Sequence, residues 1–109
     1  MTKKGYIYLL CDNKNDSFKI GKTKKSIEKR IKELQTGNSN ELFIVNYHET
    51  NYPSLVENML HKHFSEKQIL NEWYQLSNED VTNFLNICDK IEDNIKILSN
   101  NPFFKKMLK

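Results

Sequence analysis

A run of cations near the N-terminus carries the residue types that bind phosphate groups. Residues 19–32 hold seven of them against a single acidic residue, Glu28: Lys19, Lys22, Lys24, Lys25, Lys29, Arg30 and Lys32. Phosphate binding needs convergent donors of this kind, and Gly21 inside the run would let the backbone approach a ligand closely. Charge alone describes a solvated helix face equally well, so the run by itself leaves both interpretations open.

Aromatic and acidic residues on either side of this run add groups that phosphodiester hydrolysis requires. Tyr6 and Tyr8 precede it, and side chains two positions apart in a strand share one face. Glu57 and His61 follow it, four positions apart, so on a helix they lie side by side. A carboxylate can hold a divalent cation that offsets charge on a phosphate. His61 could assist such a site, bind phosphate or face solvent.

Branched and aromatic residues predict the strands that position these side chains. Three segments of this composition are residues 5–11, 17–21 and 42–47. The turn-rich residues 12–16 join the first two as a β-hairpin, and residues 72–76 can add a small edge strand.

Apolar residues at helical spacing predict three helices, over residues 27–35, 53–64 and 78–98. Ser26 is an N-cap for the first helix, and a capping box from Ser77 to Asp80 starts the third. The third helix is long and carries one apolar stripe, so we expect it to pack as core or to serve as a partner surface.

Length and charge fit one domain, residues 1–98, followed by a basic tail over residues 99–109. Residues 1–35 carry ten basic and four acidic side chains (+6), and residues 36–109 carry seven and ten (−3). A hydrophobic content of 38% excludes a disordered chain. There is no apolar run of about 18 residues and no signal-peptide core, so we expect no membrane contact. The expected location is intracellular: cytoplasmic, or nuclear or host-cell if the protein is viral.

Three short motifs occur in order: Tyr6-Ile7-Tyr8, Lys19-Ile20-Gly21-Lys22 and Ile27-Glu28-Lys29-Arg30-Ile31. Together they resemble the GIY-YIG nuclease superfamily, most closely a branch common in phage and large-virus proteins. The resemblance continues through residues 34–38, 55–61 and 71–74, and covers about residues 4–77. It implies an α/β (α+β) domain, a small three-stranded antiparallel sheet flanked by helices, that cuts phosphodiester bonds with one divalent metal ion.

The resemblance also implies roles for single residues. It puts the family's first tyrosine on Tyr8, and a one-step shift that would make Tyr6 the functional tyrosine stays open. The other family positions fall as follows: the lysine after the second motif on Lys22, the helix arginine on Arg30, the metal-binding glutamate on Glu57 and, loosely, the late asparagine on Asn71.

The second motif departs from the family at one position, because Lys19 stands where the family has a tyrosine. Beside other cations, Lys19 could give up its own charge and take a proton from water. If it stays charged, it could instead stabilise a phenolate on Tyr8. We favour the second role because the surroundings are basic.

The sequence therefore predicts an endonuclease that uses Tyr8 to activate water and Mg²⁺ (or Mn²⁺) held by Glu57. DNA is the expected partner, contacted by Lys24, Lys25, Lys29 and Lys32, and a protein partner or homo-oligomer could supply targeting. Two alternatives remain: a catalytically weak or inactive nucleic-acid-binding module with the same fold, and a structural protein that assembles through the C-terminal helix.

Overall fold

Within residues 4–100, five strands form one antiparallel sheet in the order β3-β1-β2-β5-β4. The structure is a computed structural model, and it describes residues 4–100. The strands are β1 (Gly5–Asp12), β2 (Ser17–Thr23), β3 (Leu42–Thr50), β4 (Gln68–Leu70) and β5 (Trp73–Tyr74). The α+β class is confirmed. The expected sheet of three strands is wrong in number, because β5 and the unpredicted β4 extend it.

The first predicted hairpin is present, and Asp12 closes its turn. Its carboxylate accepts hydrogen bonds from the backbone amides of Lys14 and Asn15 at 2.9 and 3.3 Å, and from the Asn40 side chain at 3.0 Å. The pKa of Asp12 is lowered: burial raises it, but these hydrogen bonds outweigh that effect. The turn therefore fixes the register in which Tyr8 faces Gly21.

The described part of the chain has four α-helices around the sheet: α1 (Ile27–Thr36), α2 (Pro53–His63), α3 (Asn78–Thr82) and α4 (Phe84–Ser99), with a 3₁₀ turn at Ser65–Lys67. Ser26 caps α1, and the capping box of Ser77 and Asp80 starts α3, as predicted. The prediction of one helix over residues 78–98 is wrong, because the helix is interrupted at Asn83. The backbone of Asn83 leaves helical geometry (φ −90°, ψ 1°) and its amide bonds to the carbonyls of Glu79 and Val81.

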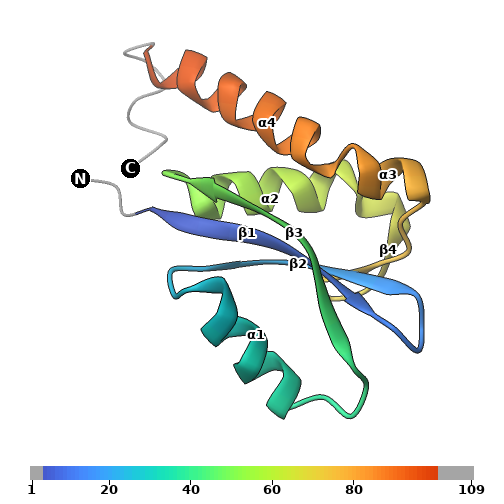
Figure 1. Cartoon of the computed structure of the whole chain (residues 1–109). Coiled ribbons are helices and arrows are strands. Elements are labelled where there is room, and N and C mark those ends of the chain that lie inside the picture. The colour runs from blue at the N-terminus through green and yellow to red at the C-terminus, as the bar shows by residue number, and fades with distance from the viewer. Residues whose placement is uncertain (1–3, 101–109) are drawn as a thin grey trace.

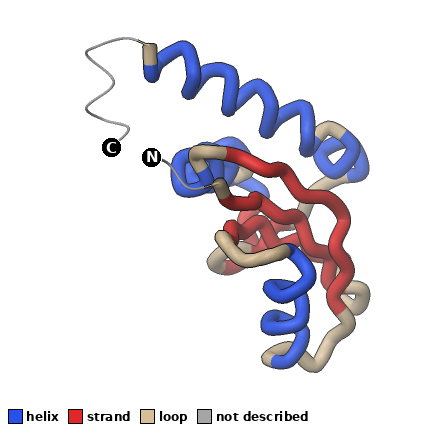
Figure 2. Tube along the Cα trace, turned by 60° about the vertical axis from the view of Figure 1, so that its left-hand side comes forward, coloured by secondary structure: helices blue, strands red, loops and turns tan. Residues whose placement is uncertain are grey.

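The sheet is the middle of three layers, with α2 and α4 on one face and α1 on the other (Figures 1 and 2). The α2–α4 face buries the larger apolar cluster: Ile7, Leu9, Ile20, Val56, Leu60, Phe64, Tyr74, Leu76, Phe84, Cys88 and Ile95. The α1 face buries Tyr8, Leu10 and Leu42, against which Ile27, Ile31, Leu34 and Trp73 pack. The helices at residues 4–100 include none long and apolar enough to cross a membrane. The predicted tail falls outside the described residues from residue 101 onward.

Candidate active site

The far end of β2 has an open edge, and the candidate site is built around it. β5 pairs only with Phe18 and Lys19 of β2, and the next residue, Ile20, donates its amide to the Glu72 carbonyl at 3.1 Å. β2 then continues to Thr23 with β1 paired on one side and, within residues 4–100, no strand on the other. Side chains from both faces of the sheet can therefore reach one ligand at this edge.

On the α1 face, Tyr8 crosses Gly21 and meets Arg30. Tyr8 is only 1% exposed and lies directly opposite Gly21 in the β1–β2 register. A Cβ at position 21 would lie 2.5 Å from the Tyr8 ring carbon Cζ, so only glycine leaves room for the phenol. Arg30 donates a hydrogen bond to the Tyr8 hydroxyl, and this bond raises the pKa of the guanidinium.

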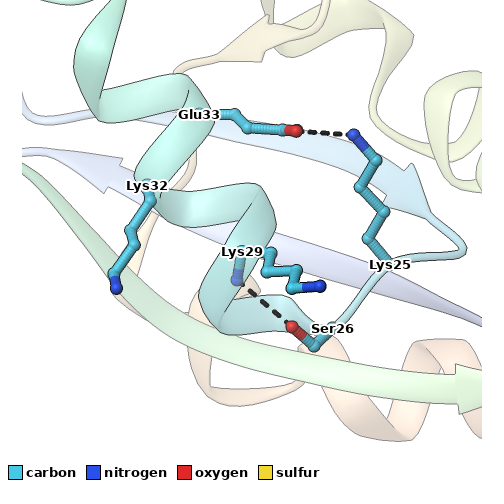
Figure 3. Close-up of a pocket in the computed structure, with 5 residues that line it drawn as sticks. All are labelled: Lys25, Ser26, Lys29, Lys32 and Glu33. Atoms are coloured by element: carbon cyan, nitrogen blue, oxygen red, sulfur yellow. Dashed lines mark hydrogen bonds and ion pairs between the residues drawn. The ribbon is translucent and has the colours of Figure 1, made fainter.

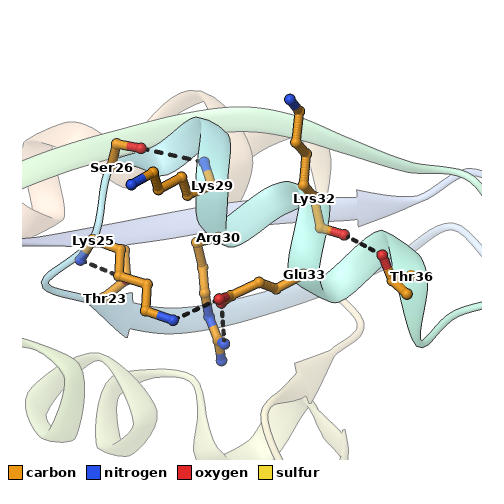
Figure 4. A network of polar contacts seen from close by, with 8 residues as sticks. All are labelled: Thr23, Lys25, Ser26, Lys29, Arg30, Lys32, Glu33 and Thr36. Carbon is orange, nitrogen blue, oxygen red and sulfur yellow. Dashed lines mark hydrogen bonds and ion pairs between the residues drawn. The ribbon is translucent and has the colours of Figure 1, made fainter.

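Arg30 is also held by its own helix. Its Nη1 lies 3.3 Å from Glu33 Oε1, and Lys25 Nζ lies 2.5 Å from the other oxygen of the same carboxylate (Figure 4). The Arg30 Nε is buried and has no hydrogen-bond partner among residues 4–100. The guanidinium is therefore fixed in direction and keeps one donor unsatisfied.

On the α2 face, Lys22 and Glu57 form the second half of the site. Lys22 Nζ lies 2.8 Å from Ser54 Oγ and 3.9 Å from Glu57 Oε1. The backbone amide of Lys22 also bonds to the Glu57 carboxylate. Glu57 is 9% exposed, on the side of α2 that faces β2.

Glu57 has two titratable neighbours, His61 and Glu72. His61 Nε2 lies 4.0 Å from Glu57 Oε2, while its Nδ1 contacts the Tyr74 hydroxyl. Glu72 accepts a hydrogen bond from Lys19 at 2.6 Å. One ligand atom each from Glu57, His61 and Glu72 lie within 4.8 Å of one another. This set of carboxylates and an imidazole is able to hold a divalent metal ion.

Burial dominates the electrostatics of this half. It raises the pKa of Glu57, and the charge of Glu72 raises it further, while Lys22 and Lys19 lower it. Burial also lowers the pKa of His61, which favours the neutral imidazole that metals bind. Both pKa shifts have the direction expected for an ionisable group that is buried without a close partner of opposite charge.

Next to α1, cations surround a surface hollow of about 580 Å³ (Figure 3). Its lining is Lys25, Ser26, Lys29, Lys32 and Glu33. Lys25 is turned inward to Glu33, whereas Lys29 and Lys32 point away from that ion pair (Figure 4). Lys24 lies in a neighbouring hollow of about 310 Å³ beside Lys22 and Ser54. Four predicted phosphate contacts thus line two adjacent hollows.

The structure brings the predicted residues together unevenly. Tyr8 and Arg30 meet on one face, and Lys22 and Glu57 on the other. Tyr6 lies apart, with its ring centroid 6.0 Å from that of Tyr47 on β3. Lys19 is engaged by Glu72.

Asn71 is exposed, in the left-handed turn that precedes Glu72 (φ 54°). Sequence reasoning missed Glu72 and Tyr74 as site residues. The signal available for them was their position in the matched segment 71–74, beside Asn71.

Residues 5–89 match the profile of the T5orf172 domain, which is found in phage- and viral-type endonuclease-like proteins. The match covers most of the chain, so the protein belongs to the T5orf172 domain family. Searches with this chain match no curated protein and no solved structure. Membership is compatible with a nuclease or DNA-binding module.

Proposed function

We propose that this protein is a GIY-YIG-type endonuclease that hydrolyses phosphodiester bonds in DNA with the help of a divalent metal ion. The observation that carries the proposal is the junction of Gly21 and Lys22. Gly21 receives the Tyr8 phenol that Arg30 contacts, and the next residue contacts Glu57 through both its amide and its side chain. Two half-sites of complementary chemistry are thus joined by one peptide unit.

In this proposal each residue does what its position allows. Arg30 presents its permanently charged guanidinium to a phosphoryl oxygen. Lys22 binds a second phosphoryl oxygen. Tyr8 orients the attacking water and, in its phenolate form, accepts the water's proton and becomes a neutral phenol; the Arg30 charge stabilises the phenolate before this step. In this proposal Arg30 therefore takes the supporting role beside Tyr8 that we expected of Lys19.

The metal belongs to the Glu57 side. Glu57 is a nearly buried carboxylate with further ligand atoms close by, and this donor set fits Mg²⁺ or Mn²⁺. When bound, the ion would supply Lewis-acid stabilisation of charge on the phosphate and leaving oxygen. Glu57 holds it, and Lys22 keeps the carboxylate directed toward the open edge of β2.

DNA is the substrate that the basic surface fits best. Lys24, Lys29 and Lys32 are exposed in, or just before, the helix α1 that carries Arg30, so they can extend the cationic surface that a nucleic-acid backbone would meet. Phosphate contacts of this kind position a duplex without reading its sequence. Low sequence selectivity, or targeting by a partner, follows from this arrangement.

The test is nicking of supercoiled plasmid in Mg²⁺, with loss of nicking on chelation by EDTA. Glu57→Gln and Arg30→Ala should each lower the rate about 10²–10³-fold, because each removes a stabiliser of the developing charge. Glu79→Gln and Lys90→Ala remove an exposed carboxylate and an exposed cation far from the site and should nick normally. Full activity in both site variants would contradict the assignment.

One observation favours a second function, a DNA-binding module without catalysis. Lys19 replaces the second tyrosine and is held by Glu72 at 2.6 Å, so it does not contribute a second phenol. Such a module would bind DNA without metal, with affinity that falls steeply as salt rises. Salt-dependent binding that is unchanged by EDTA, together with no nicking, would favour this alternative.

A further inference from the structure

The cluster around Glu57 extends beyond the residue that the resemblance assigns to the metal. Glu57 and His61 come from α2, whereas Glu72 comes from the turn between β4 and β5. One candidate ligand atom from each lies within 4.8 Å of the others. Two separate elements, a helix and a turn between strands, therefore bring carboxylates to one place.

Glu57 has no close side-chain partner despite its burial. It is 9% exposed, and among residues 4–100 no side chain donates a hydrogen bond to it. Its nearest side-chain nitrogen atoms are Lys22 Nζ at 3.9 Å and His61 Nε2 at 4.0 Å, and the backbone amide of Lys22 also contacts it. Carboxylates this far removed from water normally have closer partners. The carboxylate is thus open to a further cation.

Glu72, in contrast, already has a cation. Lys19 Nζ lies 2.6 Å from Glu72 Oε2, and the Lys19 side chain is only 14% exposed. The same ammonium lies 5.9 Å from the centre of the Trp73 ring, which keeps it over β5. A metal ion bound by Glu72 would have to share or replace this contact, since both cations neutralise one carboxylate.

His61 is oriented to take part. Its Nδ1 is engaged by the Tyr74 hydroxyl, which leaves Nε2 directed at Glu57. A hydrogen bond on one ring nitrogen commonly fixes a histidine so that the other nitrogen can bind a metal. The ring is therefore positioned by a buried tyrosine of the sheet.

We propose that Glu72 is a second carboxylate ligand of the ion held by Glu57, and that Lys19 is the counter-ion that holds Glu72 in place until the metal displaces it. The inference rests on the proposed function for the identity of the ion and extends its site from one carboxylate to two. Mg²⁺ is commonly bound through one or two carboxylates plus water. Lys19 is then a positioning residue and does not touch the reacting phosphate.

The experiment is a titration of the whole protein with Mn²⁺ in the absence of DNA, in which the electron paramagnetic resonance signal of free Mn²⁺ reports binding. Glu72→Gln should weaken binding about tenfold, as expected for a lost ligand. Lys19→Met should tighten binding several-fold, because it removes the competing charge and keeps the stem over Trp73. Lys19→Arg keeps the charge and should bind like the wild type.

Three results would overturn the inference: wild-type affinity in Glu72→Gln, weaker binding in Lys19→Met, or no Mn²⁺ binding by the wild type. Lys19→Gln repeats the charge removal with a polar side chain, and circular dichroism checks that each variant is folded. Plasmid nicking is scored separately. Nicking with unchanged Mn²⁺ affinity in Glu72→Gln contradicts this inference alone. The expected Mn²⁺ series without nicking contradicts the proposed function and supports the two-carboxylate centre.

Discussion

Among residues 4–100, the α2–α4 face of the sheet buries eleven residues in one apolar cluster, whereas the α1 face buries three. Helix α1 itself has no buried residue, and its outer surface carries Lys29 and Lys32. Burial of apolar area is the main source of folding free energy. The comparison indicates that the α2–α4 face supplies most of the stability. Helix α1, held to the sheet by apolar residues and by the Tyr8–Arg30 contact, is free to present cations to solvent.

The largest expected effect tests this division of stability directly. Phe84→Ala removes a fully buried ring between α4 and the sheet and should lower the free energy of unfolding by about 3–5 kcal/mol. Ile31→Ala, on the half-buried side of α1, should lower it by only about 1 kcal/mol. Urea unfolding followed by circular dichroism measures both. Equal losses would show that the two faces contribute alike.

Gly21→Ala should disrupt the contact between Tyr8 and Arg30 on the α1 face. The new methyl group would overlap the Tyr8 phenol and push it away from Arg30, at a cost of about 1–3 kcal/mol in stability and with loss of nicking. Gly37→Ala is the matched control, because its Cβ would have no neighbour nearer than 4.0 Å and its φ is −90°. Thermal unfolding and the plasmid assay should separate the two variants; similar behaviour would argue against the overlap.

The contact between His48 and Glu92, on the α2–α4 face, should make a smaller contribution to stability, and this contribution should depend on pH. His48 Nε2 lies 2.7 Å from Glu92 Oε1, between β3 and α4. Burial raises the pKa of Glu92, but hydrogen bonds from Thr50 and His48 lower it more, so the net shift is downward. A carboxyl whose pKa is lower in the folded state stabilises the fold above its unfolded pKa and loses this effect as pH falls through the folded value.

Glu92→Gln should therefore lower the free energy of unfolding by about 1–2 kcal/mol near pH 7. The difference from wild type should shrink as the pH falls below 4.5, the ordinary pKa of a glutamate. Urea unfolding at several pH values measures this difference. Glu33→Gln, which removes an exposed acid on α1, should change stability little at any pH. If the difference in unfolding free energy between Glu92→Gln and wild type stayed constant across acid pH, the stabilising role of the His48–Glu92 contact would be contradicted.

The smallest expected effect concerns the exposed cations of the α1 face. Lys29→Gln should lower DNA affinity slightly and reduce the salt slope of binding by about 0.9, the value for one lost phosphate contact on duplex DNA. Lys90→Gln removes an exposed cation of α4 and should leave the slope unchanged. Fluorescence anisotropy with a labelled duplex at several salt concentrations gives both slopes. A reduced slope in Lys90→Gln alone would place DNA on the opposite side of the molecule.

Much of the fold was predictable because its elements carry local signals. Ser26, the box of Ser77 and Asp80, and the apolar spacing of α1 and α2 marked the helices. Strand β4 had no such signal, because its three residues are all exposed and lack alternation. The break at Asn83 was hidden for a different reason: Phe84 and Cys88 continue the apolar spacing that begins before it.

The candidate site was predictable only in part. Tyr8, Lys22, Arg30 and Glu57 lie in or near motifs that a sequence can show, and the structure places them in two adjoining pairs. Glu72 reaches the same place only because Asn71 adopts a left-handed turn and β5 pairs with a strand some 50 residues earlier in the chain. No local pattern encodes that pairing. Lys19 was therefore interpreted against Tyr8, although its partner is Glu72.

The junction at Gly21 and Lys22 has a consequence for tolerance to motion. Consecutive Cα atoms are about 3.8 Å apart, a distance set by covalent bonds and not by packing. Both halves of the site contact this one peptide unit: Tyr8, the partner of Arg30, packs against Gly21, and Glu57 contacts the amide of Lys22. A small displacement of α1 relative to the sheet would therefore leave Tyr8, Gly21 and Lys22 in register, because these three residues lie on paired strands. The relative placement of the two halves of the site would then tolerate substitutions elsewhere in α1 and α2, as long as Gly21 keeps its contact with Tyr8 and Lys22 keeps its contact with Glu57.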